Sequence, residues 1–212
     1  MEHIVIFVLF FMSIVAHEVA HGWTALKLGD PTAKLKGRLS FNPLVHIDPV
    51  MTIVVPIVVF VMSGFSFIFG GAKPVPINPF NFKKPDRDLM ISSIAGPLTN
   101  VMIGLFFSVI LMVYVHGKGS GFQPKTDIGF KIFTFITFIN FFLAMFNLIP
   151  IPPLDGSRVL RYFMPDDIKN GMDRAEPFGM IIVVAILLSP LGKPIFALFH
   201  KFLNWYFQFI LN

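Results

Sequence analysis

Hydrophobic residues run in long stretches along this chain, with short polar segments between them. A helix needs about 20 consecutive apolar residues to cross a bilayer, and six stretches approach or exceed that length. They cover residues 4–26, 50–71, 89–116, 128–151, 176–191 and 194–211. The pattern predicts an all-α polytopic membrane protein with about five to six transmembrane or re-entrant helices and a small membrane-associated β or irregular segment.

The polar segments are too short to form a soluble accessory domain. The longest of them, 27–48 and 72–88, are well below the size of an independently folding unit. Residues 1–212 are therefore expected to form a single membrane domain. Only SPLGKP (189–194) separates the last two apolar stretches, which predicts a tight helical hairpin or one broken span.

Segment 50–71 differs from the other apolar stretches because Pro56 and Gly64 interrupt it and basic loops flank it on both sides. Loops rich in Lys and Arg tend to stay on the cytoplasmic face, so both ends of this segment are expected on one face. Irregular backbone at membrane depth is tolerated where protein or water covers it. We therefore expect a re-entrant segment here.

The Gly- and Pro-rich stretch FIFGGAKPVPINPF (67–80) follows this segment. An extended backbone here could pair with an unwound substrate by β-addition, which uses backbone hydrogen bonds and needs little sequence specificity. This stretch is the expected β or irregular part of the fold.

Composition supports a membrane protein. The 212 residues are 55% hydrophobic and 14% charged, whereas roughly a quarter of the residues in soluble domains are charged. The formal net charge is +5, which we attribute to loop Lys and Arg that set topology, and we expect no nucleic-acid partner. The chain has no cysteine, so a metal site must use His, Asp or Glu.

The first apolar stretch contains two histidines and a glutamate within HEVAH, residues 17–21. Ionisable groups at membrane depth are costly and mark a functional site by default. On a helix, His17 and His21 lie on one face, so both imidazoles can reach one metal ion. Glu18 projects beside that pair, where it can act as a general base without being a ligand.

A catalytic zinc site usually has three protein ligands. Two residues are candidates for the third ligand. One is Asp155, which follows three prolines in FNLIPIPPLDG (146–156), and the other is His46 in FNPLVHIDP (41–49). The residues alone leave this choice open.

Three motifs, HEVAH, SIAGPLTN (93–100) and NLIPIPPLDG (147–156), resemble in their order the site-2 protease family of intramembrane zinc metalloproteases. The resemblance covers nearly the whole chain and is closest to the short members without PDZ or CBS domains. It implies a membrane-embedded zinc metalloendopeptidase that hydrolyses peptide bonds within or near transmembrane segments of membrane-protein substrates.

The resemblance also implies roles for individual residues. His17, His21 and Asp155 would hold one zinc ion, Zn2+, with Asp155 matching the aspartate of the family's L-D-G motif. Glu18 would be the catalytic base.

Two asparagines match the same motifs. Asn147 leads the last motif and would bind the substrate backbone. Asn100 follows the family's G-P and is carried over to substrate binding with less support from the residues themselves, because a lone Asn in a membrane helix usually bonds a neighbouring helix.

The remaining histidines are expected to be structural. For His46 the alternatives are a supporting or gating role near the zinc, or direct ligation. His3, His116 and His200 lie near predicted helix ends, where amphipathic side chains prefer the interface.

The metal site constrains the topology. For HEVAH and Asp155 to meet at one depth, stretches 4–26 and 128–151 must run parallel, which requires an odd number of crossings between them. Stretch 89–116 supplies one crossing, so this argument also favours a re-entrant segment 50–71.

Two other functions fit parts of the pattern. A non-catalytic protein that binds zinc or chaperones membrane helices would not need Glu18. A metal transporter needs ionisable residues along a path across the bilayer, and stretches 89–116 and 176–191 offer almost none. We therefore expect a multi-pass enzyme of the cell (plasma) membrane, whose partners are lipid and a transmembrane protein substrate. The sequence does not determine the oligomeric state.

Overall fold

The structure is a computed structural model that describes residues 2–62, 64, 70–119, 122–124, 126–190 and 192–211. Its α-helices are α1 (Glu2–Lys27), α2 (Thr32–Leu35), α3 (Val55–Met62), α4 (Pro85–Gly117), α5 (Ile128–Asn147), α6 (Asp155–Tyr162), α7 (Asp166–Ala175), α8 (Gly179–Leu188) and α9 (Gly192–Leu211). Shorter 3-10 or π-helical turns are η1 (Pro43–His46), η2 (Pro49–Val54), η3 (Pro79–Asn81) and η5 (Glu176–Phe178). No strand is assigned within the described residues, so the all-α class is confirmed and the β segment is not.

Three helices, α1, α4 and α5, are long and apolar enough to cross a bilayer. Their apolar parts measure 24, 33 and 20 residues, and a helix of 20 residues already spans about 30 Å. A bent pair of helices raises the number of candidate spans to four at most. The expected count of five to six transmembrane or re-entrant helices is therefore not confirmed.

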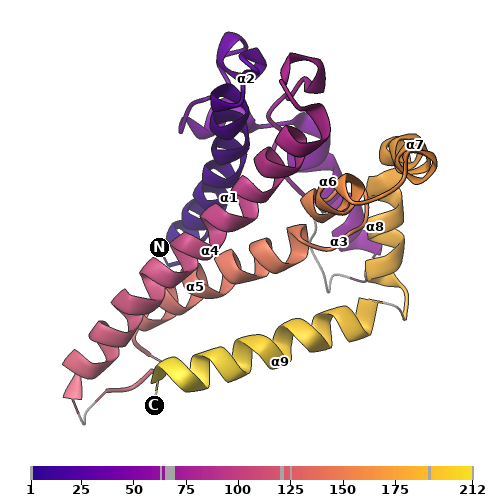
Figure 1. Ribbon diagram of the computed structural model, residues 1–212. Helices are drawn as coiled ribbons and strands as arrows, with labels where there is room; N and C mark the ends of the chain where they lie inside the picture. Colours follow the sequence, from indigo (N-terminus) through magenta and orange to yellow (C-terminus); the bar gives the residue numbers. More distant parts are fainter. Residues whose placement is uncertain are drawn as a thin grey trace.

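The bent pair lies at the C-terminal end of the chain. Residues Asp166–Leu187 and Gly192–Gln208 form two helical parts that meet at 80°. This angle is far from the reversal of direction that an antiparallel hairpin needs. After the bend, α9 runs beside α5 (Figure 1), where Phe199 packs edge-on against Phe142. The structure therefore has a broken helix pair rather than the tight hairpin.

Helices α1 and α4 pack against each other in opposite directions (Figure 1). His21, near the end of α1, bonds the carbonyl of Ser92 near the start of α4. His17, one turn earlier in α1, bonds Asn100, two turns later in α4. Because the contacts advance in opposite directions along the two helices, α1 and α4 are antiparallel.

Helices α1 and α5 run in the same direction. Ser13 in α1 accepts a hydrogen bond from Asn140 in α5. One turn later in α1, His17 contacts Asp155, which lies shortly after the end of α5. The contacts advance together, so α1 and α5 are parallel and the geometric expectation from the metal motifs is confirmed.

Segment 50–71 starts as a short helix and returns to its own beginning. Residues Pro49–Met62 form a continuous apolar helix, π-helical and then α-helical, that is too short for a full span. The N–H of Gly71 donates to the carbonyl of Met51 (3.0 Å), and the hydroxyl of Thr52 donates to the carbonyl of Gly71 (2.8 Å). Both ends therefore lie side by side, as a re-entrant segment requires and a spanning helix excludes.

The stretch expected to be β or irregular, 67–80, is only partly described, because residues 67–69 lie outside the described residues. From Gly70 to Asn78 the backbone has no regular secondary structure, so the irregular form is what the structure has. This segment connects the end of the re-entrant part to η3 and passes along α1.

Candidate metal centre

Two imidazoles and a carboxylate meet where α1, α4 and α6 come together. His17 and His21 lie one turn apart on α1, and Asp155 is the first residue of α6. Oδ2 of Asp155 lies 3.1 Å from Nε2 of His17 and 3.2 Å from Nε2 of His21, and the two Nε2 atoms are 3.0 Å apart. All three side chains are buried. The three residues expected to hold a metal are therefore brought together, although ligation itself stays a prediction.

The other nitrogen of each imidazole is held by α4. Nδ1 of His17 lies 2.5 Å from Oδ1 of Asn100, and Nδ1 of His21 lies 2.7 Å from the carbonyl oxygen of Ser92. An amide oxygen and a carbonyl oxygen can only accept, so each Nδ1 carries the proton and donates. In the neutral imidazole each Nε2 is then an unprotonated acceptor, and it points toward the other two groups.

The donor set fits a zinc ion. With neutral imidazoles, two Nε2 lone pairs and a carboxylate oxygen converge within hydrogen-bond distance of one another, an arrangement that a cation stabilises. With zinc–ligand distances near 2.0 to 2.1 Å, a tetrahedral site separates its ligand atoms by about 3.3 Å. The observed separations of 3.0 to 3.2 Å are close to that spacing. Three protein ligands also leave the fourth position that catalytic zinc sites keep open.

Gly96 of α4 leaves the space in which the ligand atoms meet. A Cβ built on Gly96 would contact the imidazole of His21 and lie 2.6 Å from Nε2 of His17. Ser92, Gly96 and Asn100 are spaced four residues apart, so they form one face of α4 toward α1. This face supplies one acceptor for each imidazole and, between them, room for the metal.

The position of Asp155 also depends on a close approach between two backbone segments. It is followed by Gly156, where an added Cβ would lie 2.7 Å from the carbonyl oxygen of Ile149. The absence of a side chain at Gly156 therefore lets the start of α6 pack onto the loop that follows α5. This contact gives a physical reason for the D-G pair of the last motif.

Asn100 belongs to a buried polar network. Its Nδ2 donates to Oδ1 of Asn140 (2.9 Å), and Nδ2 of Asn140 donates to the hydroxyl of Ser13 (3.0 Å). Both polar atoms of Asn100 thus bond groups inside the protein, which differs from the substrate-binding role that the resemblance implies. The substrate-binding role stays a prediction, and the geometry shows Oδ1 of Asn100 bonded to Nδ1 of His17.

Replacing Asn100 with alanine should weaken zinc binding by about 10- to 100-fold, because partners that orient metal-ligating histidines typically contribute that much. Competition against a chelator of known affinity measures the effect. Asn204→Ala is the matched control, since Asn204 is an exposed asparagine of α9 that bonds His200. An unchanged zinc affinity in Asn100→Ala would refute the orienting role.

Glu18 stands beside the triad and is not part of it. Its Oε2 accepts a hydrogen bond from the backbone N–H of Val75 (2.7 Å). The cluster of possible metal ligands within the described residues consists of His17, His21 and Asp155. This placement agrees with a group that acts next to a metal without binding it, and the catalytic role stays a prediction.

Two further candidates lie apart from the triad. Asn147 donates from Nδ2 to the carbonyl of Leu143 in its own helix (2.9 Å), and its expected role in substrate binding stays a prediction. His46 is fully buried, bonds the carbonyl of Ser40 (2.8 Å) and contacts Arg38. Its Nδ1 and Nε2 face these groups and not the triad, so the structure does not support direct ligation by His46.

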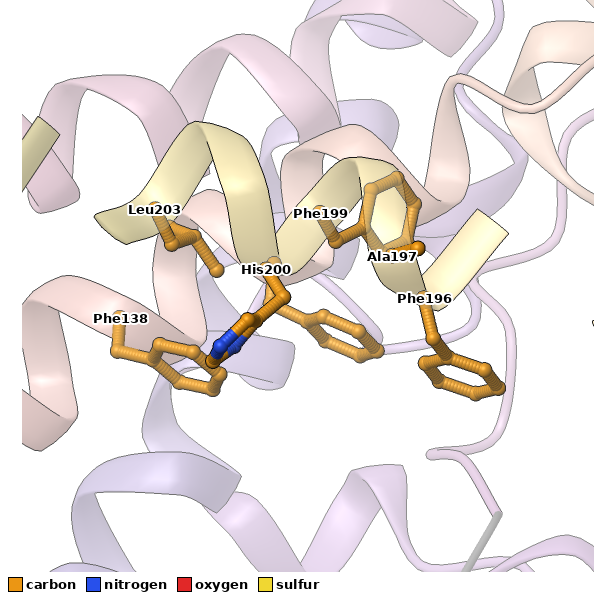
Figure 2. Close-up of a pocket in the computed structure, with 7 residues that line it drawn as sticks. Phe138, Phe196, Ala197, Phe199, His200 and Leu203 are labelled. Carbon is orange, nitrogen blue, oxygen red and sulfur yellow. The ribbon is translucent and has the colours of Figure 1, made fainter. Parts of the chain in front are cut away.

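A cavity of about 410 Å³ lies between α5 and α9, away from the triad. Figure 2 shows its lining, which is formed by Phe138, Phe142, Phe196, Ala197, Phe199, His200 and Leu203. His200 is the single polar residue in this lining, and it bonds Asn204 (2.9 Å). The other lining residues are apolar, and the structural role expected of His200 stays a prediction.

Sequence reasoning missed Gly96, Asn140 and the carbonyl of Ser92. The four-residue spacing from Ser92 to Asn100 on an apolar helix was a usable signal for a helix face toward α1. No comparable signal pointed to Asn140, because its role depends on which helices become neighbours.

The chain matches known proteins along most of its length. The family model described as peptidase family M50 matches residues 123–190. "Putative zinc metalloprotease YwhC" of Bacillus subtilis is 37% identical over 183 residues, which cover 86% of this chain and 79% of that protein. "Putative zinc metalloprotease Rip2" of Mycolicibacterium smegmatis is 28% identical over 200 residues, covering 93% and 71% respectively.

A more distant match is "Protease RseP" of Photorhabdus luminescens, 27% identical over 117 residues, 54% of this chain and 44% of that protein. No solved structure matches significantly. The identity and coverage shared with YwhC, together with the family model, establish the family. The chain belongs to peptidase family M50, the site-2 protease family, and is a membrane metalloprotease.

Proposed function

We propose that this metalloprotease is an intramembrane endopeptidase that hydrolyses peptide bonds within or near transmembrane segments of membrane-protein substrates. It uses one zinc ion held by His17, His21 and Asp155. Residues 1–212 act as one catalytic domain, and the enzyme resides as a multi-pass protein in the cell (plasma) membrane.

One observation carries this proposal. The convergent acceptors Nε2 of His17, Nε2 of His21 and Oδ2 of Asp155 lie where α1 and α4, two of the helices apolar enough to cross a bilayer, meet the start of α6. A triad at that position is within reach of peptide bonds that lie in the bilayer. A protease for soluble substrates would have no reason to bury its ligands among candidate spans.

Different residues of the chain have different roles in the hydrolysis. Zinc, when bound, lowers the pKa of a water molecule and polarises the scissile carbonyl. Glu18 accepts the proton that this water loses and passes it to the amide nitrogen, so that the C–N bond breaks and a carboxylate and an amine leave. Asn100 and the carbonyl of Ser92 keep both imidazoles in the tautomer that binds metal.

We place substrate binding near the end of α5. A substrate helix must unwind before its carbonyl can reach the site, because the helix satisfies its own backbone groups. Asn147 lies at the last position of α5, and its Oδ1 can accept a bond from an unwound backbone. We propose it as a substrate-binding residue on that basis.

Removing the metal tests the proposal. The purified protein should cleave at least one member of a panel of single-span reporters, each with a soluble tag at both ends, and the new termini should map within or next to the span by mass spectrometry. Dialysis against a chelator should abolish cleavage, and one equivalent of zinc per chain should restore it. Cleavage confined to the soluble tags, or cleavage that survives metal removal, would refute the proposal.

A further inference from the structure

An extended segment passes Glu18 on its way from the re-entrant part to η3. The backbone N–H of Val75 donates to Oε2 of Glu18 at 2.7 Å. The side chain of Val75 packs on Gly22, one turn after Glu18, where an added Cβ would lie 2.7 Å from Cγ1 of Val75. Gly22 therefore leaves the space that brings this backbone to the glutamate.

On the N-terminal side of Val75, the buried side chain of Arg38 binds the segment. Nη2 of Arg38 donates to the carbonyl oxygen of Lys73 (2.6 Å), and the N–H of Lys73 donates to the carbonyl oxygen of His46 (2.8 Å). The imidazole of His46 bonds Ser40 and contacts Nη2 of Arg38 at 3.5 Å. Arg38 is 8% exposed and His46 is 0% exposed. Both are buried polar side chains to which the chemistry of the metal centre gives no role.

On the C-terminal side of Val75, the buried carboxylate of Asp30 binds the segment. Asp30 is 0% exposed, and its Oδ2 accepts a hydrogen bond from the N–H of Asn78 (2.7 Å). Its Oδ1 accepts bonds from the N–H of Thr32 (3.0 Å) and from Nδ2 of Asn81 (2.7 Å). Burial raises the pKa of Asp30, but the bonds from Asn81, Thr32 and Asn78 outweigh it and keep the pKa below its ordinary value. The anchor is therefore ionised at neutral pH.

These contacts define a clamped segment, residues 73–78, that is fixed at both ends. Lifting it would take the carbonyl of Lys73 from a buried guanidinium and the N–H of Asn78 from a buried carboxylate, and each such loss is costly. The segment also has few N–H donors to offer a substrate strand. Between residues 73 and 76 the N–H groups of Lys73 and Val75 are already bonded inside the protein, and Pro74 and Pro76 have none. A rigid support agrees with these facts better than a lid or the expected site of β-addition.

We propose that the clamped segment positions the carboxylate of Glu18 beside the metal centre. Arg38, His46 and Asp30 are then positioning residues, which act through the backbone of Val75 and touch neither metal nor substrate. The inference rests on the proposed role of Glu18 as general base, and it gives a function to the buried polar residues of the loop that precedes the re-entrant segment.

Variants at the two anchors test this inference. Arg38→Met removes the donor to Lys73 and keeps the length of the side chain. Asp30→Asn keeps the shape but turns an NH2 group toward one of the donors. Arg38→Lys is the conservative variant, because an ammonium can still donate to the carbonyl of Lys73. Lys36→Met is the matched control, because Lys36 is an exposed cation two residues before Arg38.

We expect the two anchor variants to lower kcat on the best-cleaved reporter by about 10- to 100-fold, because misplacing a catalytic group by about 1 Å costs that much. KM should change by less than about twofold, since substrate binding is untouched. Zinc content should stay at one per chain. Amide exchange in the peptide covering residues 70–78 should accelerate about tenfold, and Arg38→Lys should restore most of both effects.

Three results would overturn the inference: unchanged exchange at 70–78 in the anchor variants, wild-type kcat despite faster exchange there, or loss of zinc together with faster exchange throughout α1 and α4. A wild type that cleaves no reporter would refute the proposed function and not this inference. In that case the variant Glu18→Ala tests the inference. Amide exchange at Val75 should accelerate in this variant if the bond between Val75 and Glu18 stabilises the segment. Unchanged exchange at Val75 would refute the inference.

Discussion

Replacing Glu18 with glutamine should lower kcat by about 10²- to 10⁴-fold, the range that a positioned general base contributes. Glutamine has nearly the same shape and keeps an amide oxygen that can accept the N–H of Val75, so the clamped segment should remain in place. It cannot take a proton from water. The expected result is therefore a protein that binds one zinc and its substrate normally but does not cleave.

The measurement combines reporter cleavage with metal analysis of the same preparation. Zinc content and KM serve as internal controls, since Glu18 lies beside the cluster of ligands and outside it. Cleavage at the wild-type rate by Glu18→Gln would remove Glu18 from the mechanism. Loss of zinc in this variant would show that Glu18 is a ligand, which would also contradict the assignment.

Replacing Gly96 with alanine should abolish zinc binding and with it all activity. The added methyl group would lie in contact with His21 and 2.6 Å from Nε2 of His17, in the space where the ligand atoms converge. Neither imidazole can move away without breaking the bond of its Nδ1 to Asn100 or to Ser92. Because alanine is the better helix former by about 1 kcal/mol, a loss of zinc cannot be ascribed to a weaker helix.

Gly104→Ala is the matched control on the same helix. There the nearest atoms to an added Cβ belong to the ring of Phe141 at 3.2 Å, so the ring has to move by only a few tenths of an ångström. This variant should bind zinc with wild-type affinity. Stoichiometric zinc binding by Gly96→Ala, measured by equilibrium dialysis, would show that the metal does not lie where the three acceptors meet.

Much of the site could be predicted from the chain because its chemistry is local. His17 and His21 share a face of one helix at any packing, since four residues make about one turn. The ionisable residues of HEVAH lie in an otherwise apolar stretch, which marked them as functional. The order of the motifs, by its resemblance to the family, identified Asp155. The closeness of the two ends of segment 50–71 was also predictable, because the basic loops on both sides favour one face for both ends.

Other features could not be predicted because they depend on which segments become neighbours. Asn100 was expected to bind substrate, but the approach of α4 to α1 places it behind His17. His46 was weighed as a ligand, and the fold instead buries it with Arg38. The stretch 67–80 was expected to offer a strand edge, whereas the N–H groups of Lys73 and Val75 are used inside the protein.

By itself, the sequence determined the membrane class, the helix that carries the two histidines and the glutamate of the proposed site, and the carboxylate proposed to join them. The first two follow from hydrophobic length and from spacing along one helix, which packing does not change, and the third follows from the resemblance of the motifs. Only the tertiary structure decided how the ligands are oriented and supported. The orientation needs the antiparallel approach of α4 to α1, and the support of Glu18 needs a loop anchored by residues up to about fifty positions apart. Such contacts arise from packing between distant segments, and no periodicity in the chain encodes them.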